Sequence, residues 1–352
     1  MFAEKIIQWY TDQGRDLPWR HTNDPYHIWL SEIILQQTRI EQGRSYYAHF
    51  IETYPSVGDL AAASEQQVLR SWQGLGYYSR ARNLHAAARH IAYDLGGQFP
   101  DTYEGILALK GVGRYTAAAI ASFAYRLPYP VIDGNVYRLI ARLYGIFTPI
   151  ASDSAYREFE ALLLRLIDRE RPDLFNQAMM DFGSLHCRPR NPDCGHCIFR
   201  DECVALRQGQ VEQLPVRGRK ATVTERHFYY FDIRWQEEGE ELLLLQRRGE
   251  GDIWQGLYEL PLLETDRPIP PRSLPRRLRD TLMEWCGDAP AEITYGPKLQ
   301  HQLTHRTIQA QFIQAKYSRR PAKIPQKTNP TTLGEIKTMP ISRLIDKYLS
   351  KL

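Results

Sequence analysis

The sequence lacks long apolar runs, internal repeats and segments of low complexity, and it has only 5 cysteines. No stretch approaches the roughly 20 apolar residues that are needed to span a bilayer. Glu4 and Lys5 stand where a secretory signal would build its apolar stretch, so we expect a cytoplasmic protein. Hydrophobic residues make up 43% and charged residues 24% of the chain, which is typical of a globular protein and excludes a disordered one.

The chain also lacks a strong charge of either sign. Its net charge of +4 permits a polyanionic partner without requiring one, so the distribution of the charge matters more than its total. The length of 352 residues exceeds what one compact core usually supports, and this predicts two domains.

Helix-like stretches, interrupted by Gly, Pro and Asp, dominate roughly the first 200 residues. The clearest of them are Glu65–Trp72, Ala81–Asp94, Thr116–Tyr125 and Tyr156–Glu170. This part of the chain is therefore predicted to be all-helical.

The composition changes after residue 213. Leu214–Glu225 is rich in Arg, Lys and Thr, has little apolar content and contains a proline, which predicts a linker. Periodicity beyond it predicts strands over 228–235, 242–245 and within 298–317, a turn over 237–240, and helices over 274–286 and 341–352. The second domain, residues 226–352, is therefore expected to combine sheet and helix.

Four of the five cysteines lie in one short segment: Cys187, Cys194, Cys197 and Cys203. In a reducing compartment such crowding indicates metal binding rather than disulfides. The cysteines are separated by six, two and five residues, unlike the paired knuckles of a zinc ribbon, so an iron-sulfur cluster fits better than zinc, the main alternative. Arg188 and Arg190 lie between the first two cysteines and bring positive charge for phosphates. Cys286 is expected to be a small buried apolar residue.

Two glycines, Gly111 and Gly113, stand between helical stretches in the segment 109–116. They let the backbone turn tightly and point N–H groups outward, where a phosphate can bind, although the same pattern also serves as a helix stop. Asp133 follows in an apolar segment, just before a helix expected to begin at Val136. From the residues alone, this aspartate is either a helix N-cap or an acid with a chemical role.

Glu32 lies inside a helix predicted over Tyr26–Gln37, for which Asp24 and Pro25 are good starting residues. Its close neighbours in sequence are apolar: Trp29, Leu30, Ile33, Ile34 and Leu35. Burial would raise the pKa of this carboxyl and keep it protonated near neutrality, which is the state that a general acid needs. The alternative is a glutamate that reaches the surface or pairs with an arginine.

Taken together, LSEIILQQT (30–38), LKGVGRYT (109–116), VIDGN (131–135) and the cysteine spacing resemble the helix-hairpin-helix DNA glycosylases of the endonuclease III superfamily. Within it the resemblance is to MutY, the family of adenine glycosylases, and it covers nearly the whole chain. It implies a mostly α glycosylase region over 1–213, with the helix-hairpin-helix near 109–135 and the iron-sulfur loop over 187–203. A linker over 214–225 and an α+β Nudix-like recognition domain over 226–352 would follow.

Catalytic roles follow from the same resemblance. In the family, the glutamate that matches Glu32 protonates the adenine, the aspartate that matches Asp133 stabilises the sugar cation, and the four cysteines hold a [4Fe-4S] cluster. Tyr115 stands where bifunctional relatives place a lysine nucleophile, and a tyrosine cannot form a Schiff base, which implies a monofunctional enzyme. Asn135 joins this catalytic group, and phosphate contact is the expected role of nearby Lys110.

Binding residues are implied as well. Those for the substrate are Arg15, Leu17, Trp19, Arg20, Gln37, Thr38, Tyr77, Gln177, Thr304 and His305, and those for DNA phosphates are Gly111, Gly113, Arg188 and Arg190. Gln37 and Tyr77 resemble residues that wedge into the duplex. Thr304 and His305 resemble the loop that recognises 8-oxoguanine, although Leu303 and Thr304 replace the phenylalanine and serine of well-known members.

The implied function is the removal of adenine opposite 8-oxoguanine or guanine in double-stranded DNA, by a monomeric, monofunctional base excision repair enzyme that needs no membrane. It would act in the cytoplasm, on the nucleoid if the source is bacterial. Two alternatives stay open: a non-catalytic DNA-binding iron-sulfur protein, and a Nudix-type nucleotide hydrolase. The second needs several closely spaced glutamates on a helix, and 274–286 offers only Glu284, so nucleotide hydrolysis is not expected.

Overall fold

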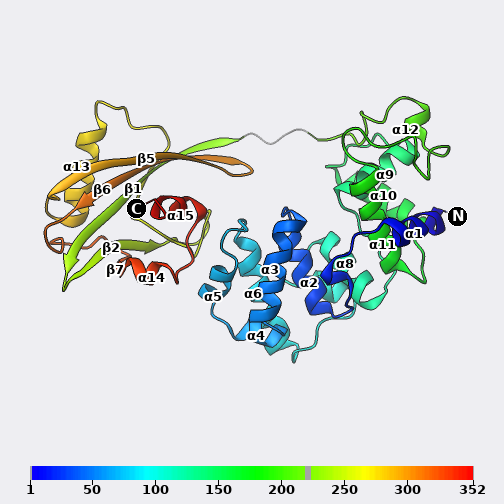
Figure 1. Cartoon of the computed structure of the whole chain (residues 1–352), viewed down its shortest axis with the longest axis horizontal. Coiled ribbons are helices and arrows are strands. Elements are labelled where there is room, and N and C mark those ends of the chain that lie inside the picture. The colour runs from blue at the N-terminus through cyan, green and yellow to red at the C-terminus, as the bar shows by residue number, and fades with distance from the viewer. Residues whose placement is uncertain (1, 219–222, 352) are drawn as a thin grey trace. The chain divides into compact units, whose positions relative to one another are not determined.

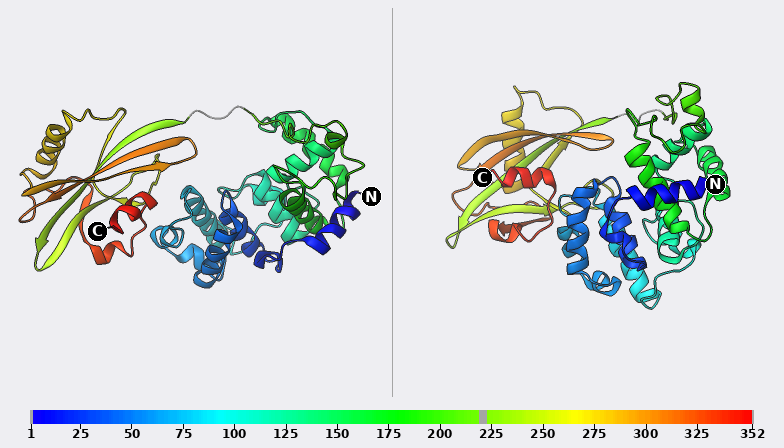
Figure 2. Two further views of the ribbon diagram at one scale, coloured as in Figure 1. Left: turned by 45° about the horizontal axis from the view of Figure 1, so that its top comes forward. Right: turned by 45° about the vertical axis from the view of Figure 1, so that its right-hand side comes forward.

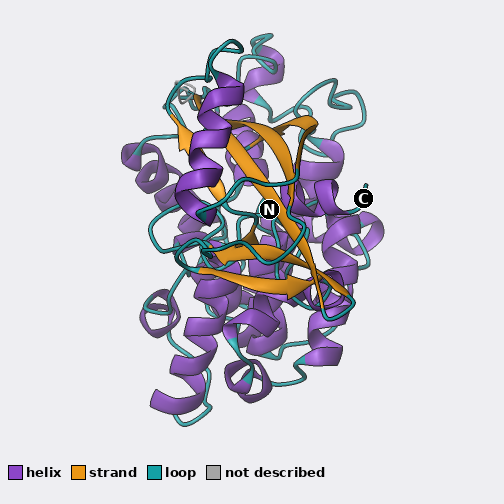
Figure 3. Ribbon diagram, turned by 90° about the vertical axis from the view of Figure 1, so that its left-hand side faces the viewer, coloured by secondary structure: helices purple, strands orange, loops and turns teal. Residues whose placement is uncertain are grey.

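The computed structural model describes residues 2–218 and 223–351. Contacts divide the chain into two compact units (Figure 1). The first comprises the described parts of Met1–Ala62 and Asn83–Lys220, and the second comprises Ala63–Arg82 with the described part of Ala221–Leu352. All strands of the described residues, orange in Figure 3, belong to the second unit.

The first unit is built from helices. Their bounds are α1 Phe2–Gln13, η1 Pro18–Arg20, α2 Pro25–Leu35, α3 Ile40–Thr53, α4 Val57–Ala62, α6 Ser79–Arg89, η2 His90–Asp94, α7 Tyr103–Leu107, α8 Arg114–Tyr125, α9 Gly134–Tyr144, α10 Asp153–Leu166, α11 Pro172–Asp181, η3 Phe182–His186 and α12 Val204–Arg207. Side chains cap several helix starts, as where Ser152 accepts the N–H of Ala155 at α10. Helix α6 begins in the second unit.

The core of the first unit lies where α1, α8, α9, α10 and α11 meet. Helix α9 shows why these helices associate, because Val136, Leu139, Ile140 and Leu143 recur at the spacing of one helix face and all are buried. Phe159 and Phe175 from the neighbouring helices fill the same core and are fully buried. This packing fixes the start of α9 and the second half of α11.

The second unit contains a mixed, 7-stranded sheet among its described residues. Its strands are β1 Thr224–Glu237, β2 Glu240–Arg247, β3 Tyr258–Glu259, β4 Leu262–Thr265, β5 Glu292–Gln302, β6 Arg306–Lys316 and β7 Thr328–Thr332. The main order is β3-β2-β1-β6-β5, with β4 paired to β1 and β7 paired to β2. The β1–β6 pair is parallel, and it places Thr224 opposite Arg306.

Both faces of this sheet are covered, because successive side chains of a strand point to opposite faces. Phe228 and Tyr230 of β1 pack in one core with α14 (Leu333–Ile336) and α15 (Arg343–Leu349). Phe231 and Ile233 pack in another core with α13 (Leu274–Cys286). Figures 1 and 2 show α13 and α15 on opposite sides of the sheet.

The segment 63–82, which contains α5 (Glu65–Ser71), groups with the sheet rather than with the other helices. Gln66 donates to the hydroxyl of Tyr258 at 2.8 Å, and Arg82 donates to the carbonyl of Gln255 at 2.9 Å. The boundaries expected from the sequence did not anticipate this grouping, and they remain predictions.

Both ends of the predicted linker, 214–225, carry structure. Leu214 is buried and its carbonyl accepts a hydrogen bond from Arg142 at 3.1 Å, while the carbonyl of Val216 accepts one from Ile150 at 3.0 Å. At the other end, Thr224 already begins β1. Residues 219–222 of the linker lie outside the described residues.

Several predicted element ends need correction. The helix of Glu32 ends at Leu35, before Gln37, which has a φ of 56° and so cannot continue it. The helix after Asp133 begins at Gly134, because the Asp133 side chain caps it there. The predicted helix over 274–286 is confirmed as α13. No helix of residues 2–218 or 223–351 has the length and apolar character to cross a membrane.

Candidate active site

A cavity of about 180 Å³ opens in the first unit, and both predicted catalytic acids line it. The predicted site residues on its wall are Arg15, Leu17, Trp19, Arg20, Glu32, Thr38, Tyr115, Asp133, Asn135 and Gln177. They come from η1 and the loop before it, from α2 and the turn after it, from α8 and α11, and from the start of α9, so segments far apart in sequence meet here. Seven further residues complete this wall and were not predicted: Thr22, Ile28, Ser31, Leu35, Ile40, Phe123 and Met180.

Glu32 is the buried acid of the cavity, and its residue is 8% exposed. Burial raises the pKa of its carboxyl to about 7, and the nearby charge of Asp133 acts in the same direction. A hydrogen bond with Tyr115 and the positive charge of Arg20 act in the opposite direction, but burial dominates. A large fraction of Glu32 is therefore protonated at neutral pH.

Asp133 caps the N-terminus of α9 and is surrounded by neutral donors. The backbone N–H groups of Asn135 and Val136 donate to its Oδ1 at 2.8 and 2.7 Å, and the Asn135 side chain donates to its Oδ2 at 2.6 Å. Burial raises the pKa of this carboxyl, and the three hydrogen bonds lower it. Helix capping and a place on the cavity wall are thus combined in one residue, although the sequence suggested them as alternatives.

Asp181, which sequence reasoning missed, fixes one side of the cavity. Arg20 binds both of its oxygens at 2.8 Å, and Arg15 donates to it from its backbone N at 2.8 Å and from Nε at 2.9 Å. Its carboxylate is fully buried. Burial alone would raise its pKa, but the arginines hold the pKa below its usual value. The missed signal was an acid between Met180 and Phe182, the same apolar context that pointed to Glu32.

Gln177 and Trp19 are held in place on the cavity wall. The hydroxyl of Tyr10 donates to Oε1 of Gln177 at 2.6 Å, which leaves the NH₂ of this amide for another partner. Trp19 is 7% exposed and packs edge-on against Tyr47, with ring centroids 5.4 Å apart. Both side chains are therefore oriented by residues behind them.

Gln37 and Tyr77 do not line the cavity. Both side chains are exposed, and both backbones have positive φ values, 56° and 48°. Non-glycine residues rarely adopt this left-handed conformation. Within the second unit, the Tyr77 hydroxyl hydrogen-bonds the hydroxyl of Thr304, so two predicted DNA contacts lie side by side.

The predicted hairpin lies between α7 and α8. Gly111 has a φ of 82°, and a Cβ built there would come within 2.6 Å of Cβ of Asn83, so only glycine fits. Gly113 precedes α8 and faces open space, with no heavy atom within 4 Å of a built Cβ. The first N–H groups of a helix have no acceptor within that helix, so this end of α8 can receive an anion.

The four clustered cysteines line a single cavity, and all are free thiols. The buried side chain of Arg142 donates to Sγ of Cys187 at 3.5 Å and to the carbonyl of Arg188 at 2.8 Å. The backbone N–H of Phe199 donates to Sγ of Cys197 at 3.4 Å. Two of the four sulfur atoms thus receive N–H donors, which suits the ligands of an iron-sulfur cluster. Cys286 lies apart, fully buried under the sheet.

No three His, Cys, Asp or Glu side chains of the described residues are arranged to hold a metal ion. Arg188 and Arg190, the predicted phosphate contacts of the cysteine segment, are exposed.

Thr304 and His305 lie in the short β5–β6 loop, residues 303–305, and both are exposed. The backbone N–H of Thr224 donates to the carbonyl of His305 at 3.0 Å, and the N–H of Leu303 donates to that of Arg306 at 2.8 Å. The loop therefore has fixed ends and side chains that are open to a partner.

Two family models match the chain, and the first spans the segment 63–82 that groups with the sheet. The model described as "HhH-GPD superfamily base excision DNA repair protein" matches residues 30–167, and a model of the NUDIX domain matches residues 231–351. A solved thermostable thymine-DNA glycosylase is 29% identical, with a TM-score of 0.54 over 59% of this chain and 95% of that one. A solved endonuclease III–DNA complex, 22% identical with a TM-score of 0.52 over 59% of this chain and 94% of that one, shares the fold. The first unit thus defines a helix-hairpin-helix base excision repair glycosylase.

Sequence relatives show which kind of base excision repair glycosylase this chain is similar to. The adenine DNA glycosylase of Buchnera aphidicola subsp. Schizaphis graminum is 30% identical over 266 residues, which are 75% of this chain and 76% of the relative. That of Buchnera aphidicola subsp. Acyrthosiphon pisum is 33% identical over 262 residues, or 74% of each. The human adenine DNA glycosylase is 39% identical over 226 residues, 62% of this chain and 41% of that protein. The chain belongs to the adenine DNA glycosylase family, which confirms the predicted resemblance, the glycosylase activity and the two-part fold.

Proposed function

We propose that this chain hydrolyses the N-glycosidic bond of adenine that stands opposite 8-oxoguanine or guanine in double-stranded DNA. One observation carries the proposal: Glu32 and Asp133 line the same cavity in different electrostatic environments. The printed name of the relatives, adenine DNA glycosylase, supports the choice of base. Because the cavity is recessed among helices, the adenine must leave the base stack to reach it.

Glu32 is the proposed general acid. When a purine leaves deoxyribose, negative charge develops on the base, and a proton delivered to a ring nitrogen removes it. Glu32 can supply that proton because its pKa of about 7 keeps much of it protonated at neutral pH. Tyr115 hydrogen-bonds this carboxyl and is proposed to orient it toward the base. Because position 115 holds no lysine, the enzyme is expected to leave an abasic site without cutting the strand.

Asp133 is the proposed stabiliser of the sugar. Positive charge develops on the deoxyribose ring as the base departs, and a carboxylate facing it lowers the energy of the transition state. Burial raises the pKa of Asp133, and two backbone N–H groups and the Asn135 amide oppose that rise, which favours the ionised form that this role requires. The base leaves with the proton from Glu32, and water then attacks the anomeric carbon and gives up a proton that restores the Glu32 carboxyl.

Surrounding residues would bind the DNA. Trp19 and Gln177 would hold the extruded adenine, by ring contact and through the free NH₂ of the amide. Gln37 and Tyr77 would wedge into the duplex, while the hairpin at Gly113 would take a phosphate. Thr304 and His305 are proposed to contact the base opposite the adenine. Binding should weaken as salt rises, because phosphate contacts release counterions.

The four cysteines would hold a [4Fe-4S] cluster, which would contribute by fixing the loop 187–203 rather than by taking part in hydrolysis. Purified protein should contain about four iron atoms per chain. A Cys197→Ser variant should lose iron, whereas a Cys286→Ser variant, changed in the sheet core, should keep it. Equal iron content in both variants would contradict this ligand set.

The Nudix-like domain is proposed to recognise DNA and not to hydrolyse nucleotides, and the protein is proposed to act as a monomer in the cytoplasm or on a nucleoid. Acidic residues on α13 are few, namely Asp280 and Glu284. Incubation with 8-oxo-dGTP and magnesium should therefore release no product.

The deciding experiment is alkali-induced strand scission on duplexes that differ only in the base opposite a single adenine. We expect cleavage with 8-oxoguanine, weaker cleavage with guanine and none with thymine. Cleavage should require alkali, and borohydride should trap no covalent adduct. Equal cleavage opposite thymine would refute the proposed specificity, and strong trapping would refute the monofunctional assignment.

A further inference from the structure

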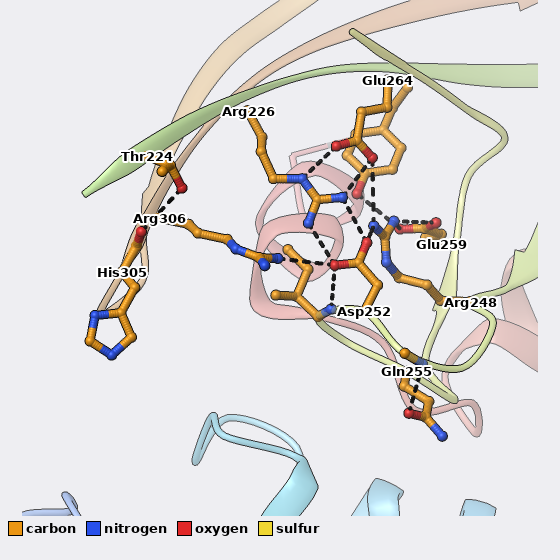
Figure 4. A network of polar contacts seen from close by, with 12 residues as sticks. Thr224, Arg226, Arg248, Asp252, Gln255, Glu259, Glu264, His305 and Arg306 are labelled. Carbon is orange, nitrogen blue, oxygen red and sulfur yellow. Dashed lines mark hydrogen bonds and ion pairs between the residues drawn. The ribbon is translucent and has the colours of Figure 1, made fainter. Parts of the chain in front are cut away.

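A network of arginines and carboxylates lies beside the β5–β6 loop in the second unit (Figure 4). Its members, called here the arginine–carboxylate network, are Arg226, Arg248, Arg306, Asp252, Glu259 and Glu264. The three positive and three negative charges balance. One end of it is buried, since the side chains of Arg248 and Glu259 are 8% and 4% exposed, whereas Asp252, Glu264 and Arg306 are 31%, 35% and 42% exposed.

Asp252 is the centre of the network. Arg226 donates to both carboxylate oxygens of Asp252, at 2.6 and 2.7 Å, and Arg306 donates to Oδ1 at 3.1 Å. Arg248 donates to Oδ2, and the N–H of Ile253 donates to Oδ1 at 2.7 Å. These partners hold the pKa of the Asp252 carboxyl well below its ordinary value, so it stays ionised over the whole working range.

The arginines do not play equal parts. Arg226 is also fixed by Glu264, and Arg248 by Glu259, so both are held from two sides. Arg306 is the most exposed of the three, with 42% of its side chain accessible, against 18% for Arg226. Among the described residues, Asp252 is the acid that pairs with the Arg306 side chain. The position of Arg306 therefore depends on Asp252.

Arg306 is also the residue at which the chain passes from the β5–β6 loop into β6. It is the first residue of β6 and directly follows His305. Its carbonyl accepts the N–H of Leu303 across the loop at 2.8 Å, and it pairs with Thr224 of β1, whose N–H binds the His305 carbonyl at 3.0 Å. Figure 4 shows the Arg306 side chain reaching from this end of β6 to Asp252, while His305 points away.

We infer that Asp252, acting through Arg306, is a positioning residue that sets the β5–β6 loop for contact with the base opposite the adenine. The inference rests on the proposed function, because it takes the loop as the reader of that base. Apart from the hydrogen bond between the Thr304 and Tyr77 hydroxyls, the exposed loop of three residues is held at its ends, so an ion pair anchored in a balanced network limits how far Thr304 and His305 can shift. The network would then govern discrimination and leave the chemistry at Glu32 untouched.

The test compares affinity for a duplex with adenine opposite 8-oxoguanine with affinity for one with adenine opposite guanine. Arg306→Gln should reduce this ratio about tenfold, the change expected when one charge-assisted hydrogen bond is lost. Arg306→Lys should restore part of it. The matched control is Arg320→Gln, since Arg320 forms only a 3.6 Å pair with Glu237 away from the loop. Excision at saturating enzyme should stay within about twofold for every variant.

A second variant separates positioning from folding. Asp252→Asn should reduce the ratio as Arg306→Gln does, and the double variant should lose no more than either single one, because both remove the same contact. The inference would be overturned if Arg306→Gln left the ratio of the two affinities unchanged. It would also be overturned if the losses of the two single variants added in the double variant. Neither result would affect the proposed function. An unsubstituted chain with equal affinity for the two duplexes would also overturn the inference, whereas excision of adenine opposite thymine as fast as opposite 8-oxoguanine would overturn the proposed function, and both measurements come before any variant is made.

Discussion

Two acids, one in each unit, have pKa values that shift in opposite directions. In the first unit, burial of Glu32 outweighs the charge of Arg20 and the Tyr115 hydrogen bond, and the pKa of Glu32 rises to about 7. In the second unit, the side chain of Asp252 is 31% exposed and is contacted by three arginines, and its pKa falls. The comparison teaches that an acid whose burial outweighs its cations exchanges its proton near neutrality, whereas an acid whose cations outweigh burial keeps its charge and fixes its neighbours.

Asp181 shows that the rule follows local chemistry rather than the unit. It lies in the first unit, near the same cavity, yet Arg15 and Arg20 lower its pKa. Its carboxylate is as buried as any in the chain, so burial alone does not mark a catalytic acid. Substitution of Glu32 should therefore reduce activity, and substitution of Asp181 should reduce stability.

The largest expected effect tests the uncompensated acid. Glu32→Gln keeps the shape of the side chain but removes the transferable proton, so adenine excision should slow about a thousandfold, within the range that a general acid contributes. Thermal stability should hold or rise, because no ionisable carboxyl remains at this buried position. Single-turnover excision and thermal unfolding measure the two effects.

The control for that substitution is Glu41→Gln, an exposed glutamate on the neighbouring α3, which should change neither quantity. Full activity in Glu32→Gln would remove Glu32 from catalysis and break the comparison between the units.

The next effect tests the compensated acid. Asp181→Asn should lower the free energy of unfolding by about 3 kcal/mol, because it leaves Arg15 and Arg20 short of their buried counter-charge. Since the folded-state pKa is lowered from 3.8, the stability difference should be complete above that pH and shrink as the pH falls through the lowered value. Denaturant titration at several pH values measures it.

Asp173→Asn serves as the control, because Asp173 pairs at 3.6 Å with Arg126, whose side chain is 74% exposed. Such a pair should contribute less than about 0.5 kcal/mol. Equal losses in the two variants would mean that burial does not strengthen the Asp181 contacts.

The smallest effect is a shift along the pH axis. A general acid must be protonated, so excision should fall as the pH rises through about 7, the pKa of Glu32. The Tyr115 hydrogen bond lowers that pKa, so Tyr115→Phe should raise it and move the falling limb of the pH–rate profile to higher pH. Tyr125→Phe, which alters a hydroxyl bound to Phe99 instead, should leave the limb in place. If the falling limb of the pH–rate profile moved to lower pH in Tyr115→Phe, the hydrogen bond would raise the pKa of Glu32 instead of lowering it.

Much of the architecture could be predicted from the sequence, because local patterns carry it. The apolar neighbours of Glu32 predicted its burial, the glycines predicted the hairpin, and alternation predicted β1. Family resemblance then brought the predicted wall residues together, and ten of them do line one cavity. The individual roles of these residues remain proposals.

Contacts between distant residues could not be predicted. Asp181 meets Arg15 across 166 positions, and Asp252 meets Arg306 across 54, and no local periodicity records either pairing. The helix end at Leu35 was missed for a related reason, since Gln36 and Gln37 favour helix intrinsically and only the surrounding fold turns the chain there. The grouping of 63–82 with the sheet is likewise a property of the fold alone.

Arg142 joins two parts of the first unit that the sequence keeps apart. Its guanidinium holds the carbonyls of Arg188 and Pro189 on one side and the carbonyl of Leu214 on the other. The chain thus leaves the helices of the first unit near Leu214, which is bound by the same side chain that binds the cysteine segment. Damage to the cysteine segment, for instance by oxidation of its thiols, would therefore also disturb the contact between Arg142 and Leu214.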